Sequence, residues 1–119
     1  MQSNIFVRVL PLLREMKSNL DLAALETFLD RYHKGEWIYP SAMHRKLNLS
    51  IQEVYKILEA GVTAGVLEQN LEIYCPKCQR FIGVRYKTLY DIPDEVYCVH
   101  CDFEIEHPLK HAIIIYRVL

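Results

Sequence analysis

The four cysteines of this chain constrain its fold more than any other feature. They stand in two pairs, Cys75 with Cys78 and Cys98 with Cys101, and two residues separate the members of each pair. Nineteen residues, 79–97, lie between the pairs. A tetrahedral metal ion takes four such ligands, and a C-x2-C turn brings two sulfurs to one ion because the chain folds back tightly. The spacing therefore predicts one metal site that uses all four thiols.

The chemistry expected at this site is structural. Four thiolates close the coordination shell, whereas a catalytic zinc keeps a position open for water or substrate. We therefore expect one structural Zn²⁺ as the cofactor, with an iron-binding redox carrier as an alternative, since iron uses the same four sulfurs. His100 lies between two ligands and is expected beside the site rather than in it. His107 and His111 have no obvious third ligand, so we expect no second metal site.

The cysteine arrangement resembles the zinc ribbon family. Cys75, Cys78, Cys98 and Cys101 fall on the family's ligand positions. The resemblance implies a small antiparallel β module over residues 75–107. The chain departs from the family at the residue that follows each cysteine pair, where ribbons often carry Gly and this chain carries other residues. These two positions are Gln79 and Asp102.

Composition excludes several classes of protein. The chain has 119 residues, is 51% hydrophobic and carries a net charge of -1, so no global field attracts nucleic acid or anionic lipid. No apolar run is long enough to span a bilayer, and the N-terminal segment lacks the basic region and cleavage site of a signal peptide. We expect a cytoplasmic protein whose thiols stay reduced, without membrane or small-molecule partners. Neither a glycine-rich phosphate loop nor a nucleophile–base signature is present, so we do not expect an enzyme.

The first half of the chain has helical periodicity. Helices are expected over about 22–32, 41–48 and 51–65, with a brief strand at "EWIY" before the second of them. Ser18 and Ser50 are expected to cap the first and last of these helices, the latter through a capping box with Glu53.

The order helix, short strand, short helix, turn, longer helix and hairpin resembles that of a winged helix, and the resemblance covers about residues 20–74. Within it, "VLEQNLEIY" is expected to form two short strands around a polar turn at Gln69–Asn70. A winged helix followed at once by a zinc ribbon is similar in domain order to general transcription factors of the TFE/TFIIE-alpha type. That resemblance implies modules that act through contacts with other proteins and with promoter DNA.

We therefore expect an α+β fold that consists of a small winged helix-turn-helix domain and a C-terminal zinc ribbon of antiparallel strands. The N-terminal apolar segment is expected to be a strand or a short helix. The C-terminal apolar segment is expected to be a strand, although Pro108 could also begin a helix there. The expected segments are 1–19 (N-terminal), 20–74 (winged helix), 75–107 (zinc ribbon) and 108–119 (C-terminal strand).

Surface charge argues against duplex DNA as the main partner. The expected exposed positions are Gln52, Glu53, Lys56 and Glu59 on the third helix and Glu68, Gln69, Asn70 and Glu72 on the wing. They carry one Lys and four Glu, and a basic footprint supplies most non-specific affinity for DNA. The side chains able to contact nucleic acid or a partner protein are Arg45, Lys46, Lys77, Arg80, Arg85 and Lys87. In the competing interpretation, Arg85 and Lys87 face acidic residues of a neighbouring strand, Glu104 and Glu106.

The leading hypothesis is a non-enzymatic zinc-binding adaptor or regulatory protein that binds another protein or a second copy of itself. The alternative is a DNA-binding transcription regulator of the winged-helix type.

Overall fold

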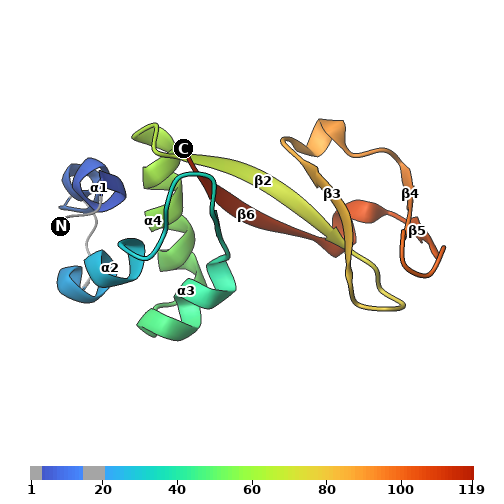
Figure 1. Ribbon diagram of the computed structural model, residues 1–119, viewed down its shortest axis with the longest axis horizontal. Helices are drawn as coiled ribbons and strands as arrows, with labels where there is room; N and C mark the ends of the chain where they lie inside the picture. The colour runs from blue at the N-terminus through green and yellow to red at the C-terminus, as the bar shows by residue number, and fades with distance from the viewer. Residues whose placement is uncertain (1–3, 15–20) are drawn as a thin grey trace. The chain divides into compact units, whose positions relative to one another are not determined.

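The computed structural model describes residues 4–14 and 21–119, which form two compact units (Figure 1). Unit 1 comprises Met1–Glu68 together with Tyr116–Leu119, and unit 2 comprises Gln69–Ile115. The fold is a mixed α+β fold with antiparallel strand pairs. Unit 2 therefore lies, in the sequence, between two parts of unit 1.

Four described helices belong to unit 1, and the last three of them correspond to the three predicted helices, although the first of those three ends at Leu29 and not at residue 32. The four helices are α1 (Asn4–Arg14), α2 (Leu22–Leu29), α3 (Pro40–Leu47) and α4 (Ile51–Thr63). The predicted capping box at the start of α4 is confirmed, because Ser50 Oγ accepts from the Glu53 N–H and the Glu53 carboxylate accepts from the Ser50 N–H. At α2 the observed cap is Asp21, whose carboxylate accepts from the Ala24 N–H. The cap predicted at Ser18 lies outside the described residues.

The N-terminal segment, expected to be a strand or a short helix, is helical over Asn4–Arg14. Ile5, Val9 and Leu13 are buried on one side of it at helical spacing. Arg8 donates from its guanidinium to the carbonyl oxygen of Ala64 at 2.8 Å, just after the end of α4.

Unit 1 buries one apolar core among its helices and the short strand β1 (Trp37–Ile38). The core includes buried side chains from α2, α3 and α4, among them Leu25, Met43 and Leu58 respectively. Burial of a side chain of this kind stabilises a fold by about 1.5–3 kcal/mol. Gly61 is buried in α4, where a Cβ would overlap the side chain of Leu67, so a larger residue there would force that side chain to shift.

The hairpin predicted around Gln69–Asn70 is wrong. Residues Leu67–Tyr74 form one continuous strand, β2, without a turn. Asn70 is buried within it, although we expected it on an exposed turn. The physical reason is the strand's position: it lies between two neighbours in the sheet order β1-β6-β2-β3, so its backbone groups are paired on both sides.

The chain returns to unit 1 through strand β6 (Ala112–Val118). This strand begins more than 35 residues after the end of β2. It pairs antiparallel with β1, with Trp37 opposite Arg117 and Ile38 opposite Tyr116. The C-terminal segment combines both predictions, because the short 3₁₀ helix η2 (Pro108–His111) begins at Pro108 and the strand follows it.

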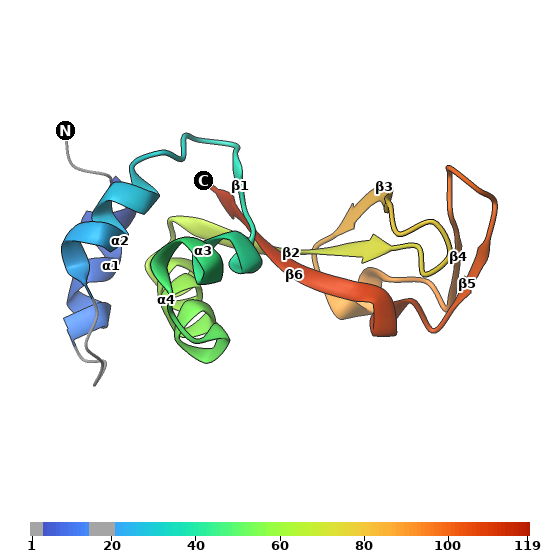
Figure 2. The ribbon, with the colours of Figure 1, turned by 90° about the horizontal axis from the view of Figure 1, so that it is seen from below.

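Unit 2 is built from short antiparallel strands that enclose a small core. Its elements are β3 (Phe81–Tyr86), the 3₁₀ helix η1 (Leu89–Asp91), β4 (Glu95–Tyr97), β5 (Glu104–Glu106) and η2. β3 pairs with β2, while β4 and β5 pair with each other and lie side by side in both views (Figure 2). Ile73, Ile82, Val96 and Ile105 form the buried core together with Cys75 and Cys98.

Candidate metal centre

The four cysteines of unit 2 meet in one cluster. Their sulfur atoms all lie within 4.8 Å of one another. The Sγ atoms of Cys75 and Cys101 are 3.7 Å apart, and those of Cys78 and Cys98 are 3.5 Å apart. A disulfide requires about 2.05 Å, so these are free thiols. A zinc ion bound at about 2.3 Å to four sulfurs at the corners of a tetrahedron sets them about 3.8 Å apart. The cluster therefore has the size that a tetrahedral thiolate-bound metal ion requires.

The two cysteine pairs are positioned by the same backbone hydrogen bonds. In each pair, the residue four positions after the first cysteine donates its N–H to the carbonyl oxygen of that cysteine. The first cysteine in turn donates its own N–H to the carbonyl oxygen of the residue five positions after it. The four bonds are Gln79 N to Cys75 O at 2.8 Å, Cys75 N to Arg80 O at 2.9 Å, Asp102 N to Cys98 O at 2.9 Å and Cys98 N to Phe103 O at 3.0 Å. Each C-x2-C segment is thus closed by its own chain and presents its two sulfurs on one side.

The residue after each pair has a left-handed backbone. Gln79 has φ 62° and Asp102 has φ 58°. These are the two positions at which the sequence departs from the glycine that zinc ribbons often carry. A left-handed conformation costs a residue with a Cβ about 1–2 kcal/mol, and Asp tolerates it better than Gln because its short side chain can bond locally. The turns therefore keep the geometry that the glycines would favour.

The thiols differ in how readily they ionise. Burial opposes ionisation of Cys75, but the N–H groups of Cys78 and Lys77, together with hydrogen bonds from the thiols of Cys101 and Cys78, outweigh burial and lower the pKa of this thiol to about 7. The N–H of Phe103 favours the Cys101 thiolate, yet burial and the neighbouring thiols raise the pKa of Cys101 to about 12. Four thiolates at this spacing repel one another, so a bound cation is needed to keep all four ionised together. The donor set is that of zinc or iron, and it leaves no open position for a substrate.

The histidines near the cluster do not join it. The ring of His100 is exposed, and its Nε2 lies 3.1 Å from the carbonyl oxygen of Phe81. Its backbone N–H approaches the sulfur of Cys98 at 3.4 Å, so the residue supports a ligand instead of replacing one. Within residues 4–14 and 21–119, the four cysteines are the only group of three or more His, Cys, Asp or Glu side chains close enough to share an ion.

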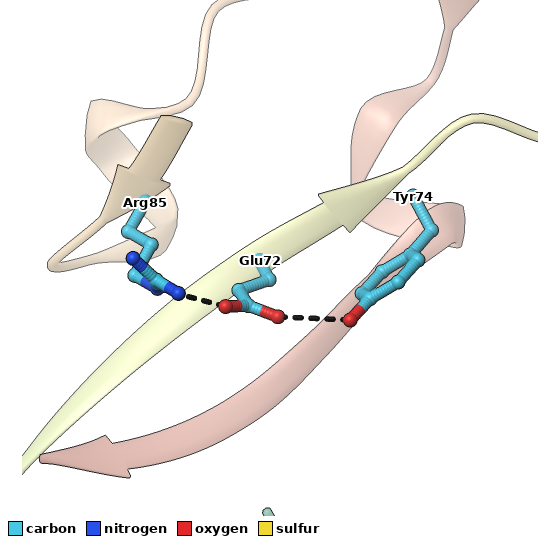
Figure 3. Close-up of polar contacts among 3 residues, drawn as sticks. All are labelled: Glu72, Tyr74 and Arg85. Atoms are coloured by element: carbon cyan, nitrogen blue, oxygen red, sulfur yellow. Dashed lines mark hydrogen bonds and ion pairs between the residues drawn. The ribbon is translucent and has the colours of Figure 1, made fainter. Parts of the chain in front are cut away.

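Arg85, which was predicted to contact nucleic acid or a partner protein, forms an ion pair with the buried carboxylate of Glu72 (Figure 3). Its Nε lies 2.7 Å from Glu72 Oε2, and the hydroxyl of Tyr74 donates to Glu72 Oε1 at 3.0 Å. The prediction that Arg85 faces Glu104 or Glu106 is wrong, because β3 pairs with β2 and places Arg85 directly opposite Glu72. Glu72 was also expected on an exposed wing, but its side chain is 0% exposed.

The three other predicted basic contacts of unit 2 lie near an aromatic ring or in solvent. The ammonium group of Lys77 is 5.8 Å from the centre of the Phe103 ring, and Arg85 also stacks on Phe81 at 4.9 Å. Arg80 and Lys87 are exposed. The rings of Phe103 and Phe81 therefore already face cations of the chain itself.

Arg45 and Lys46 are exposed on α3 of unit 1. Together with Arg31, which follows α2, they line a shallow hollow against Phe28 and Tyr32. Sequence analysis missed Arg31 because it lies 14 residues before Arg45. The signal that could have found it is the packing of α2 on α3, which helical periodicity alone does not specify. Glu72 had no such signal, since its ion-pair partner is set by strand register across a distance of 13 residues.

No protein-family model, curated protein or solved structure matches this chain. None of the described helices is long and apolar enough to cross a membrane.

Proposed function

We propose that the chain is a non-enzymatic adaptor or regulatory protein that binds another protein, with unit 2 as a zinc ribbon and unit 1 as a winged helix. The observation that carries this proposal is the closed cluster of four thiols, from Cys75 to Cys101 in the sequence, at tetrahedral spacing. A metal ion with four thiolates has no position for water or substrate, so its contribution is shape. A structural zinc contributes folding free energy directly, which a unit of only 47 residues needs.

The winged-helix assignment is supported by the order and pairing of the elements in unit 1. Helix α2, strand β1, helices α3 and α4, and then strand β2 follow one another, and β6 lies between β1 and β2 in the sheet order. In this interpretation the two strands of the wing are β2 and β6. The zinc ribbon then takes the place of the wing's turn, which explains why no turn occurs at Gln69–Asn70.

Protein contact is favoured over duplex DNA by the charges on α4, the helix that a winged helix uses to read DNA. Its exposed residues Gln52, Lys56 and Glu59 carry no net charge. DNA binding by a transcription regulator is the second candidate, and the observation that favours it is the basic hollow of Arg31, Arg45 and Lys46. The third candidate is an iron-bound redox carrier, and it is supported only by the set of four sulfur donors.

Metal analysis tests the site. Protein purified from cells grown with both metals should contain one zinc per chain and no stoichiometric iron. Cys75→Ser and Cys98→Ser should each lose the metal and unfold unit 2, whereas the matched control His107→Ala should retain it, because His107 is exposed and outside the cluster. Stoichiometric iron with visible absorption would replace the adaptor hypothesis by the redox one.

Binding measurements separate protein contact from DNA contact. Affinity capture from the native cell, followed by reconstitution with the purified partner, should yield a zinc-loaded complex. Titration with duplex and single-stranded DNA should show weak binding. Tight binding with a steep dependence on salt, reduced in an Arg45→Gln, Lys46→Gln double variant, would favour the DNA-binding candidate.

A further inference from the structure

Unit 2 contains a hollow with an apolar lining on the side of η2. Segments 92–95 and 106–110 line an open hollow of about 590 Å³, a volume within the range of ligand pockets. Ile92, Pro93, Pro108 and Leu109 supply the apolar lining. Leu109 is 53% exposed, so apolar surface is available at the mouth of the hollow.

The polar residues around this hollow are mostly acidic. Asp94, Glu95 and Glu106 line it, against one lysine, Lys110, and one histidine. The excess of negative charge extends beyond the hollow, because residues 91–110 contain six carboxylates and a single Lys or Arg.

The strands β4 and β5 place like charges opposite each other. Glu95 pairs with Glu106, and Tyr97 pairs with Glu104, so these four side chains share the exposed face while Val96 and Ile105 fill the core. Carboxylates directly opposite each other across a strand pair destabilise it. The hydrogen bond and the charge of Glu95 raise the pKa of Glu104, with a smaller contribution from Glu106. A cationic occupant would relieve this repulsion, and no basic side chain is opposite these residues in the β4–β5 register.

We propose that this acidic hollow docks a basic segment of a partner protein, with an apolar side chain against Ile92 and Leu109 and flanking Lys or Arg residues against Glu95 and Glu106. The proposal rests on the proposed adaptor function and names the chemistry of its partner. Nucleic acid and anionic lipid do not fit, because the carboxylates repel phosphate. The apolar lining favours a partner that also carries an apolar side chain, because burial of one leucine-sized side chain adds about 1.5–3 kcal/mol of binding free energy that charge alone does not supply.

The test uses the zinc-loaded full chain and a fluorescein-labelled peptide, Gly-Lys-Arg-Leu-Lys-Arg-Gly, in a fluorescence anisotropy titration. Two control peptides replace the leucine by serine or the four basic residues by glutamate. The double variant Glu95→Gln, Glu106→Gln should weaken binding roughly tenfold or more, because two charges facing the peptide are removed. Leu109→Ser should weaken it by a factor of about five or more. Glu26→Gln on α2, a matched loss of carboxylate outside the hollow, should change it less than about twofold.

A second measurement separates docking from a merely structural role. If the carboxylates serve a partner, the double variant should melt at the same temperature as the parent or higher, because it removes a like-charge pair. Four outcomes would overturn the proposal: no saturable binding of the basic peptide, equal binding of the glutamate peptide, binding unchanged in the double variant, or a lower melting temperature in that variant. A chain that self-associates in sedimentation and becomes monomeric in the double variant would also overturn it, because a second copy would then be the occupant. Zinc content measured on the same samples tests the proposed function separately, since metal-free protein would contradict that function whatever the peptide does.

Discussion

Loss of the metal should destabilise unit 1 as well as unit 2, although no cysteine lies in unit 1. The last residues of the chain, 116–119, belong to unit 1 and are held there by specific contacts. The Tyr116 side chain is buried, and its hydroxyl donates to Glu59 at 2.6 Å. Val118 donates its N–H to the carbonyl of Glu36 at 2.9 Å, and Leu119 donates to Val66 at 3.0 Å. When unit 2 unfolds, these contacts must be made across a flexible loop.

The size of the effect follows from loop closure. The loop, residues 69–115, has 47 residues. Closing it costs about (3/2)RT ln 47, or roughly 3.4 kcal/mol, whereas a four-residue turn costs roughly 1.2 kcal/mol on the same scale. A variant in which a four-residue turn joins Glu68 to Tyr116 should therefore have a unit 1 that is about 2 kcal/mol more stable than unit 1 of the metal-free full chain. That difference is a large fraction of the about 5–15 kcal/mol by which domains are stable.

The assay is urea denaturation followed by tryptophan fluorescence. Trp37, the only tryptophan of the chain, lies on β1 opposite Arg117 and so reports on unit 1. The free energy of unfolding is compared for zinc-loaded chain, chelated chain and short-turn variant, with thiol reactivity to confirm that unit 2 is open after chelation. Equal stability of the chelated chain and the short-turn variant would refute the reasoning, because it would mean that residues 116–119 do not contribute to the folding of unit 1.

Substitutions at three other features of the structure provide further tests. Gln79→Gly should stabilise the zinc-loaded protein by about 0.5–1 kcal/mol and Asp102→Gly by less, because Asp tolerates a left-handed backbone better; thermal unfolding with zinc retained measures both, and destabilisation at residue 79 would contradict the argument. Arg85→Leu should cost about 2–4 kcal/mol in urea unfolding, because it removes the guanidinium that pairs with the buried carboxylate of Glu72, and adding Glu72→Gln should recover part of the loss. Burial, with a hydrogen bond and repulsion from a carboxylate, raises the pKa of Tyr116, so the stability that its protonated form contributes is present below pH 10 and is lost as pH rises above about 10 by about 1.4 kcal/mol per unit. Tyr116→Phe should lose that part of the alkaline slope, and identical slopes would show that the tyrosine ionises without unfolding.

Local signals in the sequence were sufficient for the cysteine cluster and for several helix ends. The C-x2-C spacing identified the four thiols because each turn is closed by hydrogen bonds within its own six residues. The capping box at Ser50 and the left-handed Gly65 after α4 are likewise set by residues within four positions of each other. Such features depend on nearby atoms, so a sequence pattern records them.

Strand partners were not predictable in the same way. The polar pair Gln69–Asn70 has the composition of a turn, but hydrogen bonds from two neighbouring strands keep it extended, and one of those neighbours is far away in the sequence. The partner of Arg85 depended on which strand lies beside β3, and the choice between Glu72 and Glu104 is a choice of sheet topology. Both errors arose because pairing at long range overrides the local preference of the residues.

The placement of unit 2 between two parts of unit 1 also sets an order of events during synthesis. A ribosome delivers residues 69–115 before residues 116–119, and domains begin to fold as they emerge at about 5–20 residues per second. The cysteine cluster can therefore bind its metal while β1 of unit 1 still has no partner strand. The supply of metal at that moment would determine whether β6 follows a folded unit or a long unstructured loop. In a cell that is short of the metal, the pairing of β6 with β1, and with it the folding of unit 1, would therefore be delayed.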